Sequence, residues 1–251
     1  MKTNAVQEKN VNVEIVVLVN SMSQVKTKGE INNIKKACKY TDAIFSKICA
    51  RLDLAQMTEI ELKDFILSEI KKKKLKPSFS PIVISGIRAG NEIHPKPTSN
   101  KLVGFVIVDF GVRYNRYCSD MTRMLFIGKP KKTDLDIYKK LLNAQILGIE
   151  NSKINTKCFE IDHVVRESLG KYKSYFIHTL GHGVGMKIHE KPILYYKATK
   201  PVLKENMVIT IEPGIYIKDN LGMRIEDTIL ITKKGPQILT KSTKELIVIK
   251  A

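Results

Sequence analysis

The chain has 251 residues, of which 43% are hydrophobic and 27% are charged, a composition typical of a soluble globular protein. It contains no run of about 18 apolar residues, so the sequence predicts no membrane-spanning helix. The N-terminal stretch MKTNAVQEKNVNVE is polar and lacks the apolar core of a secretory signal. The four cysteines are scattered without CxxC spacing, which favours reduced thiols. We therefore expect a cytoplasmic protein without disulfides.

The charge balance is strongly basic, with 43 Lys and Arg against 25 Asp and Glu and a net charge of +18. Such a charge raises the question of nucleic-acid binding. Most of the basic residues are lysines spread along the chain, with one run at residues 71–74 that Lys76 continues. There is no Trp, and no aromatic–basic pattern typical of an RNA-binding module. We interpret the charge as a solvated surface and do not predict a nucleic-acid partner.

Helical segments are indicated by apolar residues at a spacing of about 3.6. One of them has a clear start, because Thr58 is followed three residues later by Glu61, the pattern of a capping box. The predicted helices cover residues 30–50, 58–74, 135–150 and 160–169.

Strands are indicated by β-branched runs bounded by Asn, Pro and Gly. Between the second and third predicted helices, residues 86–100 form a loop rich in Gly, Pro and Asn that carries His94. Helices in sequence blocks that alternate with antiparallel hairpins predict an α+β fold. The predicted strands are residues 11–19, 82–85, 107–112, 117–122, a short one around Ile177, 208–211, 215–217, 223–232 and 244–249.

Two aspartates belong to a predicted hairpin. If residues 107–112 and 117–122 pair around a two-residue turn at Tyr114-Asn115, Asp109 lies directly opposite Asp120, and cross-strand neighbours are about 5 Å apart. Two carboxylates this close repel each other unless one binds a proton or a cation lies between them. Asp109 also follows an apolar run, where an unpaired carboxylate is costly. The hairpin therefore predicts a metal site.

Two glutamates further along the chain also lie in or next to predicted strands. Glu212 ends the apolar strand 208–211, and Glu226 shares a strand face with Arg224 and Thr228. A buried Arg224–Glu226 ion pair is the purely structural interpretation. Carboxylates together with a histidine are, however, the ligand types that a pair of divalent cations needs.

The histidines supply the nitrogen ligand. His178 and His182 are four residues apart, but the glycines at 181, 183 and 185 argue against a helix and favour close approach of the backbone to a site. His189 follows within the same stretch, and His163 lies in a helical segment without an assigned role.

These motifs resemble the metallopeptidase family of "pita-bread" fold, which contains methionine aminopeptidase, aminopeptidase P and prolidase. The resemblance rests on VIVDFGVRYNRYCSDMTRM, HTLGHGVGMKIHE, TIEPGIY and GMRIEDTILIT, and it covers about residues 29–250. It implies an α+β fold with a curved antiparallel sheet covered by helices.

The resemblance also implies a dinuclear metal centre. Asp109 would bind one metal ion, Asp120 and Glu226 would bridge both, and His182 and Glu212 would complete the set. A metal-bridged hydroxide would attack the scissile carbonyl, with Glu212 as proton shuttle. Oxygen-rich ligation with one histidine favours two manganese ions, with cobalt, iron or zinc as alternatives.

Further residues receive roles from the resemblance. His178 and His189 would steady the substrate and the tetrahedral intermediate. His94 is similar to the family's substrate-side histidine, although here it precedes Pro95 rather than following a proline. Arg224 would orient the bridging carboxylates.

The branch of the family is indicated by two features that disagree. Length favours methionine aminopeptidase, whereas SDMTR, EPGIYI and RIEDT resemble the Xaa-Pro enzymes. Weighting local chemistry over length, we expect cleavage of Xaa-Pro bonds in peptides or dipeptides with proline at the second position. The alternatives are removal of initiator Met, or an inactive module that binds nucleic acid or protein. Residues 1–28 would be a lead-in, a remnant of a lost domain, and residues 29–251 the catalytic domain; oligomeric state is left open.

Overall fold

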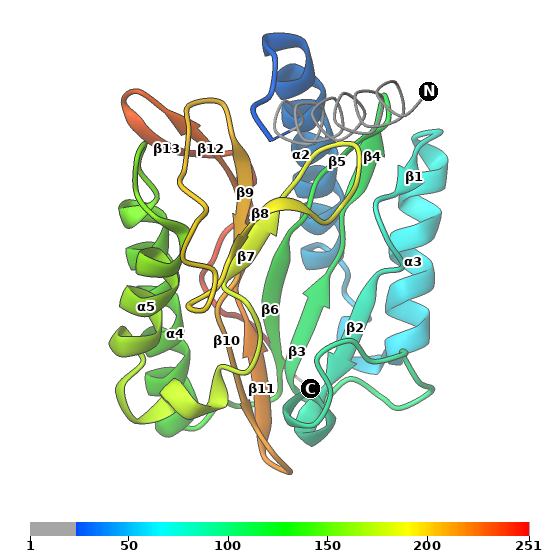
Figure 1. Cartoon of the computed structure of the whole chain (residues 1–251). Helices are drawn as coiled ribbons and strands as arrows, with labels where there is room; N and C mark the ends of the chain where they lie inside the picture. Colours follow the sequence, from blue (N-terminus) through cyan, green and yellow to red (C-terminus); the bar gives the residue numbers. More distant parts are fainter. Residues whose placement is uncertain (1–23, 251) are drawn as a thin grey trace, which may run out of the picture.

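A computed structural model describes residues 24–250, so the strand predicted at 11–19 lies outside the described residues. The fold is a mixed α+β arrangement in which strands lie between two pairs of helices, as the sequence predicted (Figure 1). All four predicted helices are present, with ends shifted by up to three residues. They are α2 (Lys28–Cys49), α3 (Glu59–Lys72), α4 (Lys132–Asn151) and α5 (Cys158–Ser168).

Capping boxes fix the starts of the first two helices. The Thr58 hydroxyl accepts from the backbone N–H of Glu61, and the Glu61 carboxylate accepts from the backbone N–H of Thr58 at 2.6 Å. Thr27 and Glu30 repeat the motif at the start of α2. Such caps satisfy backbone donors that have no partner within the helix, and each contributes about 1 kcal/mol. The capping box predicted at Thr58 is confirmed.

Two sheets form the centre of the molecule, and two smaller groups of strands extend them. The four-stranded sheet has the order β14 (Ile247–Ile249), β6 (Thr122–Ile127), β3 (Gly104–Asp109), β2 (Ile82–Ser85). The five-stranded sheet has the order β13 (Gly235–Ile238), β12 (Asp227–Thr232), β9 (Val208–Ile211), β7 (Gly181–Gly183), β8 (Glu190–Leu194). The smaller groups are β10 (Gly214–Ile217) with β11 (Leu221–Arg224), and β1 (Lys76–Pro77) with β4 (Val112–Tyr114) and β5 (Tyr117–Cys118).

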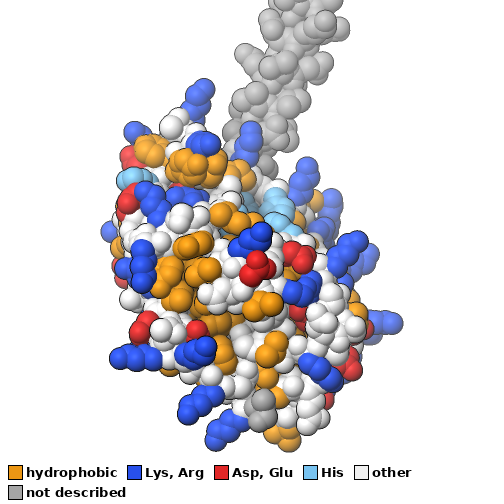
Figure 2. Space-filling model, turned by 90° about the horizontal axis from the view of Figure 1, so that it is seen from below, with side chains coloured by type: hydrophobic (Ala, Val, Ile, Leu, Met, Phe, Trp, Pro, Cys, Tyr) orange, Lys and Arg blue, Asp and Glu red, His pale blue; other side chains and the backbone are white. Residues whose placement is uncertain are grey.

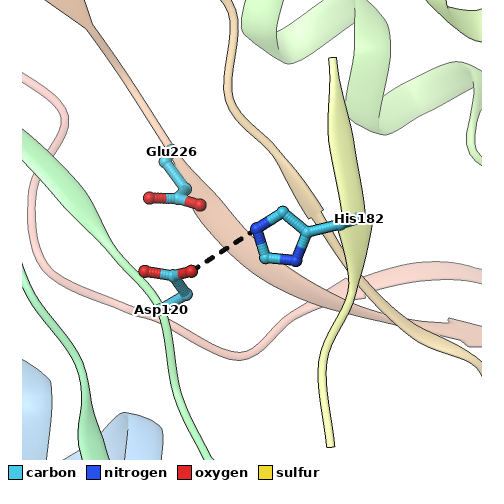
Figure 3. A group of neighbouring side chains, drawn as sticks. All are labelled: Asp120, His182 and Glu226. Carbon is cyan, nitrogen blue, oxygen red and sulfur yellow. Dashed lines mark ion pairs between the residues drawn. The ribbon is translucent and has the colours of Figure 1, made fainter. Parts of the chain in front are cut away.

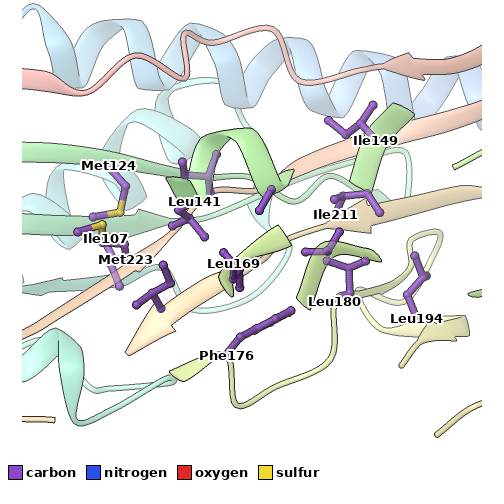
Figure 4. Packing of buried hydrophobic residues seen from close by; sticks show 14 of the residues in the cluster. Ile107, Met124, Leu141, Ile149, Leu169, Phe176, Leu180, Leu194, Ile211 and Met223 are labelled. Atoms are coloured by element: carbon purple, nitrogen blue, oxygen red, sulfur yellow. The ribbon is translucent and has the colours of Figure 1, made fainter. Parts of the chain in front are cut away.

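The core lies on both faces of the four-stranded sheet. Along β3 the side chains alternate, as the period of a strand requires. Ile107 packs in a cluster with residues of α4 and α5, such as Leu141 (Figure 4). Val106 and Val108 pack in a second cluster, with residues of α2 and α3. The sheet is therefore held between the two helix pairs, and its strand ends are left to form a site.

The turn of the hairpin at residues 107–122 lies one residue later in the chain than predicted. Asn115 and Arg116 both have positive φ, 44° and 75°, so they are the central residues of the turn. Moving the turn by one residue moves every cross-strand partner by two. Asp109 consequently pairs with Thr122, and the predicted pairing of Asp109 with Asp120 is wrong.

Two of the other predicted strands are also corrected. The strand predicted at 223–232 is two strands, because β11 pairs with β10 while β12 pairs with β9. Ile225 and Glu226 form the short connection between β11 and β12. No strand forms around Ile177, where a short 3₁₀ helix (Gly170–Tyr175) leads into extended chain. There the Phe176 carbonyl is bound by the Arg166 guanidinium instead of by a neighbouring strand.

One face of the molecule shows how its positive charge is distributed. On the face seen from below, Lys and Arg side chains project at many separate positions (Figure 2). Within residues 24–250, none of the helices has the length and apolar character needed to cross a bilayer. All four cysteines are free thiols, as expected. The cytoplasmic location and the absence of a nucleic-acid partner stay predictions.

Candidate metal centre

Three buried side chains from distant parts of the chain converge on one point. Asp120 lies between β5 and β6, His182 lies in β7, and Glu226 lies in the step between β11 and β12 (Figure 3). One ligand atom from each lies within 4.8 Å of the others. Two carboxylates and an imidazole at these separations are suited to hold a divalent cation.

The other two predicted ligands lie in the same place. Glu212 follows β9, and its Oε1 is 3.3 Å from His182 Nε2. Asp109 ends β3, and its Oδ2 is 2.6 Å from a terminal nitrogen of Arg224. Both residues line one cavity of about 410 Å³ together with Asp120, His182 and Glu226. The structure thus brings all five predicted metal ligands to one cavity, although Asp109 and Asp120 are not the direct cross-strand pair that was expected.

Two carboxylate oxygens in this cavity are free to bind cations. Asp109 Oδ1 and Asp120 Oδ1 are buried and have no hydrogen-bond partner within the described part of the chain. A buried acceptor without a donor is costly. A cation bound among these side chains would satisfy both oxygens, so the residues present fit a metal centre.

The electrostatics point the same way. Burial, and then the neighbouring carboxylates, raise the pKa of Asp120 and of Glu226 well above their usual values. Burial raises the pKa of Glu212 to about 8 although Arg224 opposes the shift. Burial lowers the pKa of His182 to about 4, so its imidazole is neutral near pH 7, which is the form that binds metals. Raised pKa values mean that, without cations, Asp120, Glu212 and Glu226 tend to bind protons, which reduces the repulsion between their charges.

Threonine hydroxyls orient the glutamates. Thr122 Oγ1 donates to Glu226 Oε2 at 2.8 Å and accepts from Arg224 Nε at 3.2 Å. Thr210 Oγ1 donates to Glu212 Oε1 at 3.1 Å and accepts from the backbone N–H of His182, also at 3.1 Å. Neither threonine was predicted from the sequence. Their signal is a spacing of two from a ligand, since Thr122 follows Asp120 and Thr210 precedes Glu212 by two positions.

A tyrosine connects the predicted arginine with a predicted histidine. Tyr216 in β10 accepts from an Arg224 nitrogen at 2.7 Å, and its hydroxyl is 3.1 Å from His178 Nε2. His178 Nδ1 is 2.8 Å from the carbonyl of Thr179, which fixes the tautomer with the proton on Nδ1. The Tyr216 hydroxyl then donates to Nε2. Tyr216 was also missed, although it stands in the motif TIEPGIY.

Three of the four remaining predicted residues line the cavity. His189 packs edge to face on His182, with ring centroids 4.4 Å apart. His94 is exposed at the edge of the cavity, on the loop that follows β2. Arg224 also lines the cavity, whereas His178 is not among its lining residues and joins the site through Tyr216.

Comparison with known proteins identifies a family to which the sequence is similar. Residues 32–233 match the model of metallopeptidase family M24. The chain is 40% identical to a Xaa-Pro dipeptidase of Pyrococcus furiosus over 237 residues, covering 92% of this chain and 67% of the relative. It is also 40% identical to an uncharacterised peptidase of Methanocaldococcus jannaschii over 229 residues, covering 89% of this chain and 65% of the relative.

Solved structures agree with the sequence relatives. The fold superimposes on the crystal structure of a dipeptidase from Pyrococcus horikoshii OT3 with a TM-score of 0.88 and 34% identity, covering 93% of this chain and 66% of that one. The chain therefore spans about two thirds of the length of the curated relatives that it matches. The matched region includes all five predicted ligands, and the chain belongs to metallopeptidase family M24.

Proposed function

We propose that this chain hydrolyses the bond before proline in peptides of the form Xaa-Pro, using two divalent cations. The observation that carries the proposal is the meeting of five ligand side chains in one cavity, two of which keep a buried oxygen without a donor among the described residues. The names of the relatives support Xaa-Pro peptides as the substrate class. We also propose that residues 29–251 form the catalytic unit.

The ligand assignment is part of the proposal. Asp109, Asp120, His182, Glu212 and Glu226 would together hold the two cations. When bound, the cations would supply Lewis acidity that lowers the pKa of water and polarises a carbonyl. An oxygen-rich set with one imidazole favours manganese, with cobalt, iron or zinc as alternatives.

The chain's own residues then have distinct tasks. Glu212 takes the proton of the attacking water and delivers it to the proline nitrogen as the C–N bond breaks, while the Thr210 hydroxyl holds the carboxylate in place. His189 and His94, on the cavity wall, orient the substrate carbonyl. Arg224 holds Asp109 directly and Glu226 through Thr122, so that both carboxylates keep their orientation.

The proposal is tested by a hydrolysis assay on protein stripped of metal and then supplied with Mn²⁺. The substrates are an Ala-Pro dipeptide, an Ala-Pro-Ala tripeptide and a Met-Ala-Ser tripeptide. We expect cleavage of a proline peptide that is lost when chelator is added. Cleavage of Met-Ala-Ser alone would assign the chain to the methionine aminopeptidases instead. Binding of Mn²⁺ without cleavage of any of the three would contradict the proposal.

A further inference from the structure

The loop between β2 and β3 carries one wall of the cavity. Its residues His94, Pro95, Lys96 and Pro97 all line the space in front of the metal ligands. After the short 3₁₀ helix Gly86–Gly90 the loop contains no regular secondary structure. An irregular segment of this length needs anchors elsewhere in the fold if it is to hold a histidine in place.

One buried carboxylate anchors both ends of this loop. Glu59, the first residue of α3, has no exposed surface. Its Oε1 accepts from the backbone N–H of Ser85 at 2.9 Å, before the loop begins. Its Oε2 accepts from the backbone N–H and from the hydroxyl of Thr98, each at 2.9 Å, near the end of the loop. A single side chain thus joins positions thirteen residues apart.

Other groups strengthen this anchor. An Arg88 nitrogen donates to Glu59 Oε2 at 2.5 Å, and another donates to the carbonyl of Lys96 at 3.3 Å. The first backbone N–H groups of α3 also bind the loop, since Glu59 N donates to the Asn100 carbonyl and Ile60 N to the Thr98 carbonyl, each at 3.1 Å. These donors have no partner inside the helix. The start of α3 and the wall of the cavity therefore form one hydrogen-bonded unit centred on Glu59.

We propose that Glu59 is a positioning residue for the reaction: without touching the substrate, it sets the place of His94 and of the cavity wall on either side of it. The inference rests on the proposed function where it is tested by kinetics. A second test, hydrogen exchange of the loop, does not require the protein to be active. A displacement of about 1 Å in a positioned group can reduce turnover on the order of a hundredfold.

Glu59→Gln is the informative change because it keeps the shape of the side chain. Each carboxylate oxygen accepts from at least one N–H, so either orientation of the Gln amide places its NH₂ group against a donor. Glu61→Gln is the matched control. It removes the same charge from the same helical turn, and the hydrogen bond that it alters, from the backbone N–H of Thr58, lies within the exposed helix cap.

The experiment measures kcat/KM for the cleaved proline peptide, Mn²⁺ affinity by calorimetry, and hydrogen exchange of residues 86–100. For Glu59→Gln we expect faster exchange in this loop, unchanged Mn²⁺ affinity, and a loss in kcat/KM of about tenfold to a hundredfold relative to Glu61→Gln. In a double-mutant cycle, the loss should largely disappear in a His94→Ala background, which a general loss of stability would not produce.

Two results overturn the inference: loop exchange that matches the wild type, or a loss in kcat/KM that is equally large with His94 and without it. If the wild-type protein cleaves none of the peptides, the proposed function fails by itself. Loop exchange then decides the anchoring role of Glu59, and wild-type exchange in the Glu59→Gln protein overturns it.

Discussion

Thr122 faces Asp109 across the β3–β6 ladder, and its hydroxyl donates to Glu226 at 2.8 Å. Thr122 therefore lies next to two proposed ligands, Asp109 and Glu226, which are more than a hundred residues apart in sequence. It also accepts from Arg224, the residue that binds Asp109. The position opposite Asp109, which the sequence analysis gave to Asp120, is occupied by a residue that orients ligands.

Replacing Thr122 with Val should weaken the metal centre without disturbing the fold. The change keeps the branched shape but removes the donor to Glu226 and the acceptor for Arg224, both buried. Loss of such a supporting hydrogen bond typically costs about 10- to 100-fold in metal affinity or activity. Calorimetric titration with Mn²⁺ and steady-state kinetics measure this loss. Thr232→Val is the control. Among the described residues, the Thr232 hydroxyl donates to the Gly235 carbonyl and accepts from the backbone N–H of Lys234, so this variant should retain wild-type affinity.

Asp120→Asn should abolish metal binding and turnover while leaving the fold intact. Burial, and then the neighbouring carboxylates, raise the pKa of Asp120, so its charge is unfavourable in the absence of cations. In chelator, the variant should be at least as stable to urea as the wild type. Retention of activity by Asp120→Asn would show that the two-metal assignment is wrong.

Metal-free protein should lose stability as the pH rises from about 6.5 to about 8, above the interval in which the lowered pKa of His182 contributes in the opposite direction. In the unfolded chain, carboxyl groups titrate near pH 4, whereas burial raises the pKa of Glu212 to about 8 in the folded state. The folded state therefore binds more protons in this interval, and deprotonation favours unfolding. Asp120 and Glu226 shift in the same direction.

The measurement is urea unfolding at several pH values, with chelator and with Mn²⁺. Bound cations replace the protons, so the decline should be much shallower with Mn²⁺ than without it. A metal-free protein whose stability rises from pH 6.5 to pH 8 would contradict the clustering of these carboxylates.

The sequence predicted the helices, and it predicted as ligands five residues that meet in one cavity, because each of them has a local signal. Thr58 and Glu61 mark a helix start by their spacing alone, and the ligands stand in short motifs. The hairpin register has no such signal, since Tyr114-Asn115 and Asn115-Arg116 are both plausible turn centres and only the three-dimensional packing selects the second. The break before Asp227 is hidden by an uninterrupted β-rich pattern.

The supporting residues could not be derived from composition or periodicity. Tyr216 and Thr210 are ordinary strand residues until β10 and β9 bring them beside Arg224 and Glu212. Glu59 is similar, because its position in a capping turn suggests a helix start and gives no indication of the loop that it binds. Its role is decided by contacts with Ser85 and Thr98, which lie in a distant segment, so no single stretch of sequence contains it.

Removal of the Arg123 guanidinium should destabilise the fold strongly. Arg123 and Asp227 are both buried and lie 2.6 Å apart, and Arg123 also donates to the carbonyl of Glu226. Although burial raises the pKa of Asp227, Arg123 and Lys244 outweigh it and keep this carboxyl below its usual pKa. Breaking a buried pair typically costs about 3–5 kcal/mol. We therefore expect a loss of this size for Arg123→Met in urea unfolding.

The control for this change is Arg51→Met, which breaks an ion pair with Asp53 whose side chains are 29% and 52% exposed. Such pairs contribute about 0–1 kcal/mol. If both variants lose the same small amount, then the Arg123–Asp227 pair does not stabilise the protein as its burial indicates.

Gly222→Ala should separate the β10–β11 hairpin from the loop that carries His94. A Cβ atom at this position would lie 1.9 Å from the carbonyl oxygen of Ala89, a backbone atom that cannot turn aside. Overpacking of this kind costs about 1–3 kcal/mol or more. Because Ala89 lies in the 3₁₀ helix just before the cavity wall, the variant should lose more turnover than Mn²⁺ affinity.

The control is Gly29→Ala in α2, where no atom lies within 4 Å of the new Cβ; this variant should gain up to about 1 kcal/mol in stability. Thermal unfolding and kinetics of the two variants measure this, and wild-type stability in Gly222→Ala would contradict the close approach of β11 to the loop.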